Sequence, residues 1–211
     1  MTPDLPGRRP LASRQWAFSQ RAAAWLAARG ASPNGISVVG MLLGIAAGAA
    51  FWATARASGP AWPWWTAGAV GVQLRLLCNL LDGMVAVATG RTSPVGELFN
   101  EVPDRVSDAA TLVGLGYAAG SVPVLGWAAA VVALFVAYVR ASGVVAGAPQ
   151  AFGGPMAKPH RMALVTLAAL VAAVAPVAWR VPAWALGLVV VGGVLTAVLR
   201  LRTIASALRA R

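Results

Sequence analysis

The sequence predicts an all-α membrane protein: a polytopic bundle of six transmembrane helices, preceded by an N-terminal helix that lies at the membrane surface. Of the 211 residues, 59% are apolar and only 11% are charged, whereas soluble domains carry about 25% charged residues. The mean hydropathy is +0.72. Apolar runs of about the ~20 residues that a spanning helix needs recur along the chain. They lack the alternating polarity of membrane β-strands.

Three segments follow from this pattern. Residues 1–34 form an N-terminal tail and an interfacial helix, in which Trp16, Phe18 and Trp25 lie among arginines. Aromatic rings and snorkelling arginines suit the headgroup level of a bilayer. Residues 35–206 form the six-helix membrane domain, and residues 207–211 form a basic C-terminal tail.

The expected spans cover residues 36–55, 64–88, 96–119, 122–139, 162–178 and 183–199. The first span carries Gly40, Gly44 and Gly48 at four-residue spacing, and such a ridge lets helices approach closely. It can serve the inside of the bundle or the interface of a homodimer, and the sequence leaves both open.

Basic residues set the orientation. The net charge is +11, and the positive-inside rule places basic loops in the cytoplasm. One side of the membrane would hold Arg8, Arg9, Arg14, Arg21, Arg29, Arg91, Lys158, Arg161, Arg200, Arg202, Arg209 and Arg211, and the other only Arg56 and Arg180. We therefore expect a multi-pass protein of the inner or plasma membrane with both termini cytoplasmic. Because the positive charge flanks the spans, we expect no nucleic-acid partner.

Five of the six acidic side chains crowd into residues 79–108: Asp82, Glu97, Glu101, Asp104 and Asp108. Charge in a bilayer is costly, so such a cluster is usually paired, metal-bound or water-lined. At ~100° per residue, Asn79 and Asp82 share one face of the second span, and Asn100 and Asp104 share one face of the third. Oxygen ligands without His or Cys suit Mg²⁺, Mn²⁺ or Ca²⁺.

Two other interpretations of the cluster stay open: a structural polar network, or a cation pathway in a small transporter or a binding protein without catalysis. The polar residues gather at one membrane face and do not continue through the last three spans. This distribution favours surface chemistry over a pathway.

The same residues resemble a family signature. Asn79-x-x-Asp82-Gly83-x-x-Ala86, followed by Gly96-x-x-x-Asn100-x-x-x-Asp104, is similar to the D-x2-D-G-x2-A-R and G-x3-D-x3-D motifs of the CDP-alcohol phosphatidyltransferases. Asn79 and Asn100 replace two aspartates, and Val87 replaces the arginine. Arg91, one turn further on, is the expected replacement for that arginine. The auxiliary acids Glu97, Glu101 and Asp108 lie on the same arc and are expected to compensate for the lost charge.

The resemblance implies a phospholipid-synthesising transferase. Family members bind a CDP-linked lipid, usually CDP-diacylglycerol, with its pyrophosphate on two divalent ions, Mg²⁺ or Mn²⁺. An alcohol hydroxyl then attacks the lipid-side phosphorus and CMP leaves. Carried over, Asn79, Asp82, Asn100 and Asp104 would hold metal, and Asp104 would be the general base. Gly83, Ala86 and Gly96 would line the CDP site.

Basic residues near the same face are candidates for binding anions. Arg140, Lys158 and Arg161, together with Arg91, are expected to bind the pyrophosphate or an acidic group of the acceptor. Binding of lipid headgroups or control of topology is the alternative for the same residues. No motif identifies the acceptor alcohol.

Overall fold

The computed structural model describes residues 16–91 and 94–210, without the side chains of Pro94, Val95 and Glu97. Within this part the fold is all-α, as predicted, and no strand occurs. The α-helices are α1 (Ala17–Ala28), α2 (Pro33–Thr54), α3 (Trp62–Ala88), α4 (Pro94–Gly116), α5 (Pro123–Val145), α6 (Lys158–Ala172) and α7 (Val181–Arg209), and a 3-10 turn, η2 (Val177–Trp179), precedes α7. All of these helices except α1 have a proline in their first two positions, where the missing N–H costs nothing.

Helices α5, α6 and α7 differ in their bounds from the sequence prediction. Helix α7 continues to Arg209, past the predicted end at residue 199. Helix α5 does not end at Arg140 but continues to Val145, because that arginine folds back onto Glu101 of α4 and leaves the backbone helical. Helix α6 begins at Lys158 and ends at Ala172, so the predicted span over residues 162–178 is wrong at both ends. Pro176 and η2 occupy the remainder.

Four helical stretches of the described chain are long and apolar enough to cross a membrane: 33–54, 62–88, 123–145 and 177–209. They correspond to α2, α3, α5 and α7. Helix α4 carries most of the acidic cluster, and α6 has only 15 residues; these two helices fall outside that group.

Helix α2 organises one half of the bundle, because it packs along both α3 and α4 while those two helices touch each other very little. Its glycine ridge makes this possible. A Cβ on Gly44 would lie 2.4 Å from the Cβ of Ser107, and one on Gly48 would lie 2.3 Å from the carbonyl oxygen of Ala110. The ridge is therefore used inside the protein, and α3 and α4 are joined by a short connection without packing closely against each other.

The apolar core lies in the half of the bundle away from the acidic cluster. Phe51, Leu112, Leu115, Met162 and Leu186 are fully buried there. Helix α6 joins this core by packing between α3 and α7. The burial fixes the relative positions of the helices that carry the polar residues.

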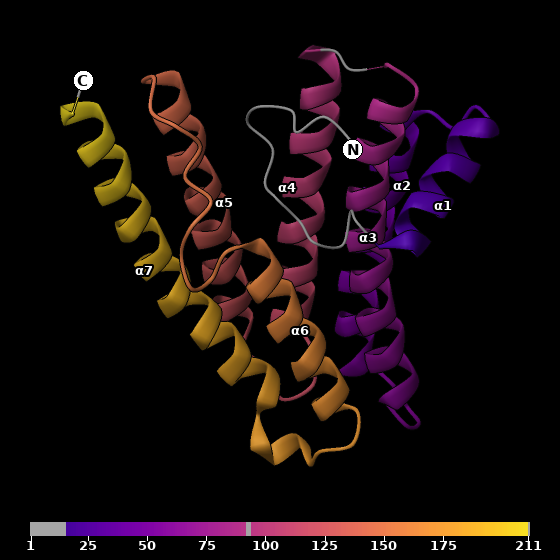
Figure 1. Cartoon of the computed structure of the whole chain (residues 1–211). Helices are drawn as coiled ribbons and strands as arrows, with labels where there is room; N and C mark the ends of the chain where they lie inside the picture. The colour runs from indigo at the N-terminus through magenta and orange to yellow at the C-terminus, as the bar shows by residue number, and fades with distance from the viewer. Residues whose placement is uncertain (1–15, 92–93, 211) are drawn as a thin grey trace.

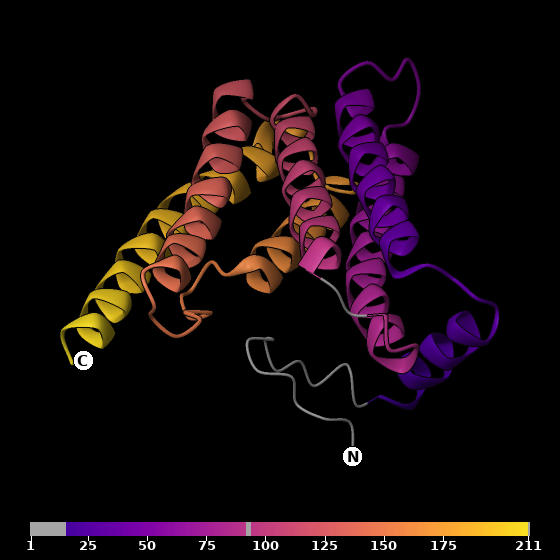
Figure 2. The same cartoon turned by 90° about the horizontal axis from the view of Figure 1, so that it is seen from above.

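The two ends of the molecule are distinct (Figures 1 and 2). One end holds the start of α4 and the C-terminal ends of α3, α5 and α7. The α2–α3 and α6–α7 connections lie at the opposite end. Arg56 and Arg180 belong to these two connections, whereas Arg91 and Arg209 lie at the first end.

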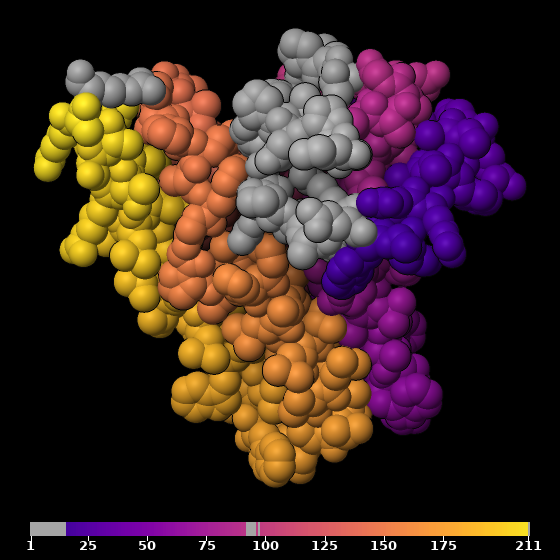
Figure 3. Space-filling model, in the orientation of Figure 1, coloured from indigo at the N-terminus to yellow at the C-terminus, as the bar shows by residue number. Residues whose placement is uncertain are grey.

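Helix α1 lies obliquely against the first end (Figure 1) and contacts α3. Its Ala23 is buried with Leu81 and Val85, while Trp16, Phe18 and Trp25 are exposed. The guanidinium of Arg29 stacks over the Trp25 ring at 3.9 Å. In the space-filling view, α1 forms one edge of the molecule and α5 and α7 the other (Figure 3).

Candidate active site

The polar side chains gather between α3 and α4, and α2 and the N-terminal turn of α6 complete their surroundings. Because α3 and α4 barely touch, side-chain contacts rather than apolar packing bridge the space between them. Most of these contacts involve three carboxylates: Glu101, Asp104 and Asp108. Asp82 differs from these three because it forms none of the ion pairs among the described residues.

Asp82 is buried, with 4% of its surface exposed. One carboxylate oxygen accepts a hydrogen bond from the Ser37 hydroxyl at 2.7 Å, and the other lies 2.5 Å from the Gly83 backbone nitrogen. Among the described side chains, no basic group comes within ion-pair distance of it. A buried carboxylate that receives hydrogen bonds only from neutral donors has an unbalanced negative charge, and a bound cation would stabilise it.

Asp104 is surrounded by donors on both oxygens. The Asn79 side-chain amide and the Arg75 guanidinium, the latter at 3.2 Å, donate to Oδ1, and the Lys158 ammonium pairs with Oδ2. Arg75 also donates to the Asp104 backbone carbonyl at 3.1 Å. Each carboxylate oxygen has two acceptor positions, so Oδ2 retains one beside Lys158.

Asp108 is the centre of a fully buried ion-pair group. It pairs with Arg75 of α3 and, at 2.5 Å, with Arg161 of α6; all three side chains are 3% exposed or less. The Arg75 Nε donates to Ser107 at 2.8 Å. Asp108 of α4 therefore links α3 and α6 through ion pairs. The charge of Arg161 is balanced inside the protein by Asp108.

Glu101 is shared by two arginines nearer the surface. Its oxygens lie 2.5 Å from Arg105 and 2.6 Å from Arg140. Arg140 also donates to Gln150 at 3.4 Å and lies over the Phe152 ring at 5.5 Å. This group connects α4 to the end of α5 and to the α5–α6 loop.

The remaining predicted residues are less engaged. Asn100 is exposed on α4, and Arg91 is exposed just past the end of α3. Ala86 is buried, Gly83 and Gly96 are half-buried, and the Glu97 side chain lies outside the described part. The structure therefore brings together three of the predicted residues around Asp104. Asn79 and Lys158 contact it directly, and Arg161 is linked to it through Asp108 and Arg75.

Sequence reasoning missed Ser37 and the full role of Arg75. Ser37 lies one turn before Gly40, on the face of α2 that packs against α3, and its hydroxyl also lies 3.2 Å from the Pro33 carbonyl. A polar residue on a small-residue face is the available signal. Arg75 contacts two carboxylates, Asp104 and Asp108, together with the Ser107 hydroxyl.

The ion pairs of the described chain join five basic side chains to three carboxylates. This part of the protein therefore carries a surplus of positive charge, which the Asp82 carboxylate only partly offsets. No set of three or more His, Cys, Asp or Glu residues lies in metal-binding proximity in the described chain. The Asp82 carboxylate is a hard oxygen donor of the kind that Mg²⁺ and Mn²⁺ prefer.

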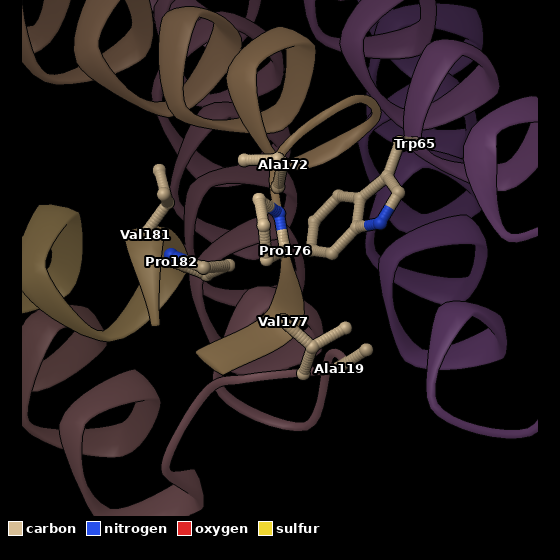
Figure 4. Close-up of a pocket in the computed structure, with 8 residues that line it drawn as sticks. Trp65, Ala119, Ala172, Pro176, Val177, Val181 and Pro182 are labelled. Carbon is tan, nitrogen blue, oxygen red and sulfur yellow. The ribbon is translucent and has the colours of Figure 1, made fainter. Parts of the chain in front are cut away.

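The bundle's small apolar cavity lies elsewhere. It has a volume of about 10 Å³ and lies near the opposite end, where Trp65, Pro176 and Val177 line it (Figure 4). A space of this size holds about one water molecule. It is too small and too distant from the carboxylates to be part of the site.

The comparisons identify the family. The sequence matches the family model of the CDP-alcohol phosphatidyltransferases over residues 31–199. The chain belongs to the CDP-alcohol phosphatidyltransferase family. The matched range begins just before α2 and includes every residue of the polar cluster.

Two curated relatives are similar in sequence. A phosphatidylinositol phosphate synthase of Streptomyces avermitilis is 30% identical over 153 residues, which cover 70% of this chain and 59% of that protein. An archaetidylinositol phosphate synthase of Aeropyrum pernix is 38% identical over 91 residues, which cover 42% of this chain and 46% of that protein. The chain thus spans roughly half the length of the two relatives that it matches.

The fold is shared with a solved protein. The phosphatidylinositol phosphate synthase of Mycobacterium tuberculosis, in complex with manganese and citrate, superposes with a TM-score of 0.75 at 23% identity, covering 90% of both chains. Its form with CDP-DAG bound gives a TM-score of 0.74, covering 90% of this chain and 94% of that one.

Proposed function

We propose that this protein transfers a phosphatidyl group from a CDP-linked lipid, such as CDP-diacylglycerol, to an alcohol hydroxyl and releases CMP. The observation that carries the proposal is the pair of signature carboxylates. Asp82 on α3 has no basic side chain within ion-pair distance among the described residues. Asp104 on α4 is close enough to interact with it electrostatically and pairs with the Lys158 ammonium. Membership of the transferase family supports the same chemistry.

In this proposal Asp82 and the amide oxygens of Asn79 and Asn100 hold a divalent cation, Mg²⁺ or Mn²⁺. Asp104, the fourth metal ligand that the resemblance implied, pairs with Arg75 and Lys158 instead. The bound cation would neutralise charge on the substrate phosphates. Gly83, Ala86 and Gly96 leave room for the CDP group beside α3 and α4.

The bond changes follow from the substrates. The acceptor oxygen forms a bond to the lipid-side phosphorus, and the bond from that phosphorus to the CMP oxygen breaks, so CMP leaves with the electron pair. Asp104 takes the hydroxyl proton through the acceptor position that remains on Oδ2. Asn79 and Arg75 hold the other oxygen and so fix the carboxylate.

For the acceptor we propose a phosphorylated polyol of the inositol phosphate class. Both curated relatives are named for inositol phosphate lipids. Lys158 and Arg140 are about one-fifth exposed, so they can reach a phosphate while still paired, and Arg91 is exposed at the same end. Arg161 is buried against Asp108 and would position the cluster rather than touch the acceptor.

The proposed placement is a six-span protein of the cell membrane with cytoplasmic termini, in which α4 and α6 complete the bundle and α1 lies at the surface. The surplus of basic residues at the end of α3 and α7 supports this orientation. A homodimer would use the outward apolar faces of α5 and α7, where Val131, Phe135 and Val191 are exposed, because the glycine ridge of α2 is already covered.

The test is CMP release by purified protein in detergent with CDP-diacylglycerol and Mn²⁺ or Mg²⁺. Inositol phosphate is offered in one arm and pooled unphosphorylated alcohols in the other. We expect metal-dependent release in the inositol phosphate arm, and no release from Asp104→Asn. The transferase proposal fails if no arm releases CMP while the protein still binds the CDP-lipid.

A further inference from the structure

We propose that this chain holds a single divalent ion, at Asp82, and that the Lys158 ammonium takes the place of a second cation on the substrate phosphates. The inference deepens the proposed transferase function and rests on it. It concerns the chemistry of the site: one exchangeable metal ion and one fixed protein cation acting together on a pyrophosphate.

Asn79 supplies the first reason. Two carboxylates facing each other across α3 and α4 would both be acceptors and would need a cation between them. Here the Asn79 amide faces Asp104 and donates a hydrogen bond to it directly. The hydrogen bond satisfies Asp104 Oδ1 from the α3 side, and no bridging ion is required at that point.

Lys158 supplies the second reason. Its ammonium pairs with Asp104 Oδ2, while Arg75 lies 3.2 Å from Oδ1. A divalent ion at Asp104 would stand against two fixed positive charges, in a cluster that already has five basic partners for three carboxylates. Repulsion at such distances is strong in a partly buried site.

Asp82 supplies the third reason. It is buried, and its described hydrogen-bond partners are the neutral Ser37 hydroxyl and the Gly83 backbone. The Lys158 ammonium acts on it electrostatically from beyond ion-pair distance, whereas it pairs directly with Asp104. The negative charge of Asp82 is therefore not balanced by an ion pair, whereas that of Asp104 is balanced by Arg75 and Lys158. One metal position therefore remains, and it lies beside a lysine that is about one-fifth exposed and can turn toward a phosphate.

The arrangement assigns Lys158 a substrate-binding role that a structural counter-ion would not have. A lysine ammonium is a compact point charge with three donors, so it can contact a phosphate oxygen and Asp104 together. Because the ammonium cannot dissociate from the protein, its single positive charge at the phosphates, beside the two charges of the metal ion, would be independent of metal concentration.

The test counts bound metal in the full chain with Mn²⁺ as the probe. Equilibrium binding to detergent-solubilised protein is measured together with the electron paramagnetic resonance spectrum. We expect one Mn²⁺ per chain and the six-line spectrum of an isolated ion. Two equivalents with exchange coupling, as for ions about 4 Å apart, would overturn the inference, and so would the absence of any bound Mn²⁺ at millimolar concentration.

Variants test which residues limit the number of bound Mn²⁺ ions to one. Asn79→Asp combined with Lys158→Met restores a carboxylate and removes the cation, and we expect it to gain a second equivalent. Gln20→Glu makes the same amide-to-carboxylate change on exposed α1 and should stay at one. If the double variant remains folded by size-exclusion chromatography and still binds one ion, the assignment to Asn79 and Lys158 is wrong.

Lys158→Met alone separates the substrate-binding role from a structural one. We expect CDP-diacylglycerol to bind about tenfold more weakly, the scale of one lost charge contact, and Lys158→Arg to recover most of the affinity. Unchanged lipid affinity would contradict the role. Failure of the function is distinguishable: an inactive protein that binds one Mn²⁺ supports the inference, and an active protein that binds two refutes it.

Discussion

At the scale of single residues, the two signature carboxylates occupy opposite environments. Asp82 is buried among neutral donors, whereas Asp104 is held by an amide, a guanidinium and an ammonium. In the proposed function the same residue type therefore has two roles: Asp82 binds the cation, and Asp104, whose charge is already balanced by Arg75 and Lys158, is held in a fixed direction. The proposed division of labour between metal binding and proton transfer follows from this difference.

Substitution of each carboxylate should separate the two roles. We expect Asp82→Asn to lower Mn²⁺ affinity at least tenfold and to abolish CMP release with it. Asp104→Asn should lower CMP release by about 10²-fold or more, the usual contribution of a general base, while Mn²⁺ affinity changes only a few-fold. Metal titration and turnover are measured on the same preparations. Equal loss of metal from both variants would contradict the division.

Asp108 should act on stability rather than on turnover alone. Asp108→Asn leaves Arg75 and Arg161 buried without a full counter-charge, and loss of one partner of a buried ion pair costs about 3–5 kcal/mol. Glu101→Gln is the matched control, because that side chain is 45% exposed and such pairs contribute about 0–1 kcal/mol. Unfolding in mixed micelles measures both, and equal losses would refute the structural role of Asp108.

Residue-level prediction from sequence succeeded for the location of the cluster and failed for its pairing. The spacing of Asn79, Asp82, Asn100 and Asp104 on two helices placed them at one end of the bundle. Arg161 was expected to face a substrate, yet it binds Asp108, which lies 53 positions earlier in the chain. Partner choice over such separations depends on helix packing, which no local pattern encodes.

At the scale of the elements, α2 determines how far apart α3 and α4 stand. Its Gly44 lies against Ser107, whose hydroxyl accepts from Arg75. The position of α2 is therefore transmitted to the cluster through these contacts, in addition to the hydrogen bond from Ser37 to Asp82. This linkage makes the glycine ridge part of the support of the site.

Gly44→Ala tests the linkage. The added Cβ would lie 2.4 Å from the Ser107 Cβ and 3.1 Å from its Cα, so the helices must separate, and overpacking of this kind costs about 1–3 kcal/mol. We expect lower thermal stability together with reduced CMP release. Gly187→Ala on α7, where nothing lies within 4 Å, is the control and should be neutral or slightly stabilising. Identical behaviour of the two variants would contradict the account.

The sequence predicted the order and type of the helices well, but the lengths of α5 and α6 poorly. Hydropathy marks where a chain is apolar enough for the membrane, and both helices extend into polar stretches. Arg140 remains helical because it reaches Glu101. Lys158 and Pro159 begin α6 because proline fits a first turn. The local sequence therefore indicates the start of α6, whereas only the tertiary contact with Glu101 explains the extension of α5 past Arg140.

At the scale of the whole molecule, the basic residues and the polar cluster lie toward the same end (Figures 1 and 2). Arg202 and Arg209 extend from α7 at that end, and Arg56 and Arg180 mark the other. In the proposed orientation, which follows the positive-inside rule, the cluster lies near the cytoplasmic surface. The sequence alone predicted that the basic residues gather at one end, because successive loops of a helical bundle lie at alternating ends.

Cysteine accessibility checks the orientation. In a Cys78→Ser background, Ser206→Cys probes the exposed end of α7 and Ser58→Cys probes the α2–α3 loop. We expect a membrane-impermeant maleimide to label Ser58→Cys on intact spheroplasts, and Ser206→Cys only in inverted vesicles. Labelling of both from the same side would exclude the proposed topology.

The central claim is that the cluster between α3 and α4 transfers a phosphatidyl group. Its most direct test follows ³²P from labelled CDP-diacylglycerol, with the label in the lipid-side phosphate, in the presence of inositol phosphate and Mn²⁺. The account predicts that label moves into a new lipid in equal amount to the CMP released, and that Asp82→Asn and Asp104→Asn abolish the transfer while Gln20→Glu does not. Transfer that survives in both aspartate variants, or CMP release without a labelled lipid product, would contradict it.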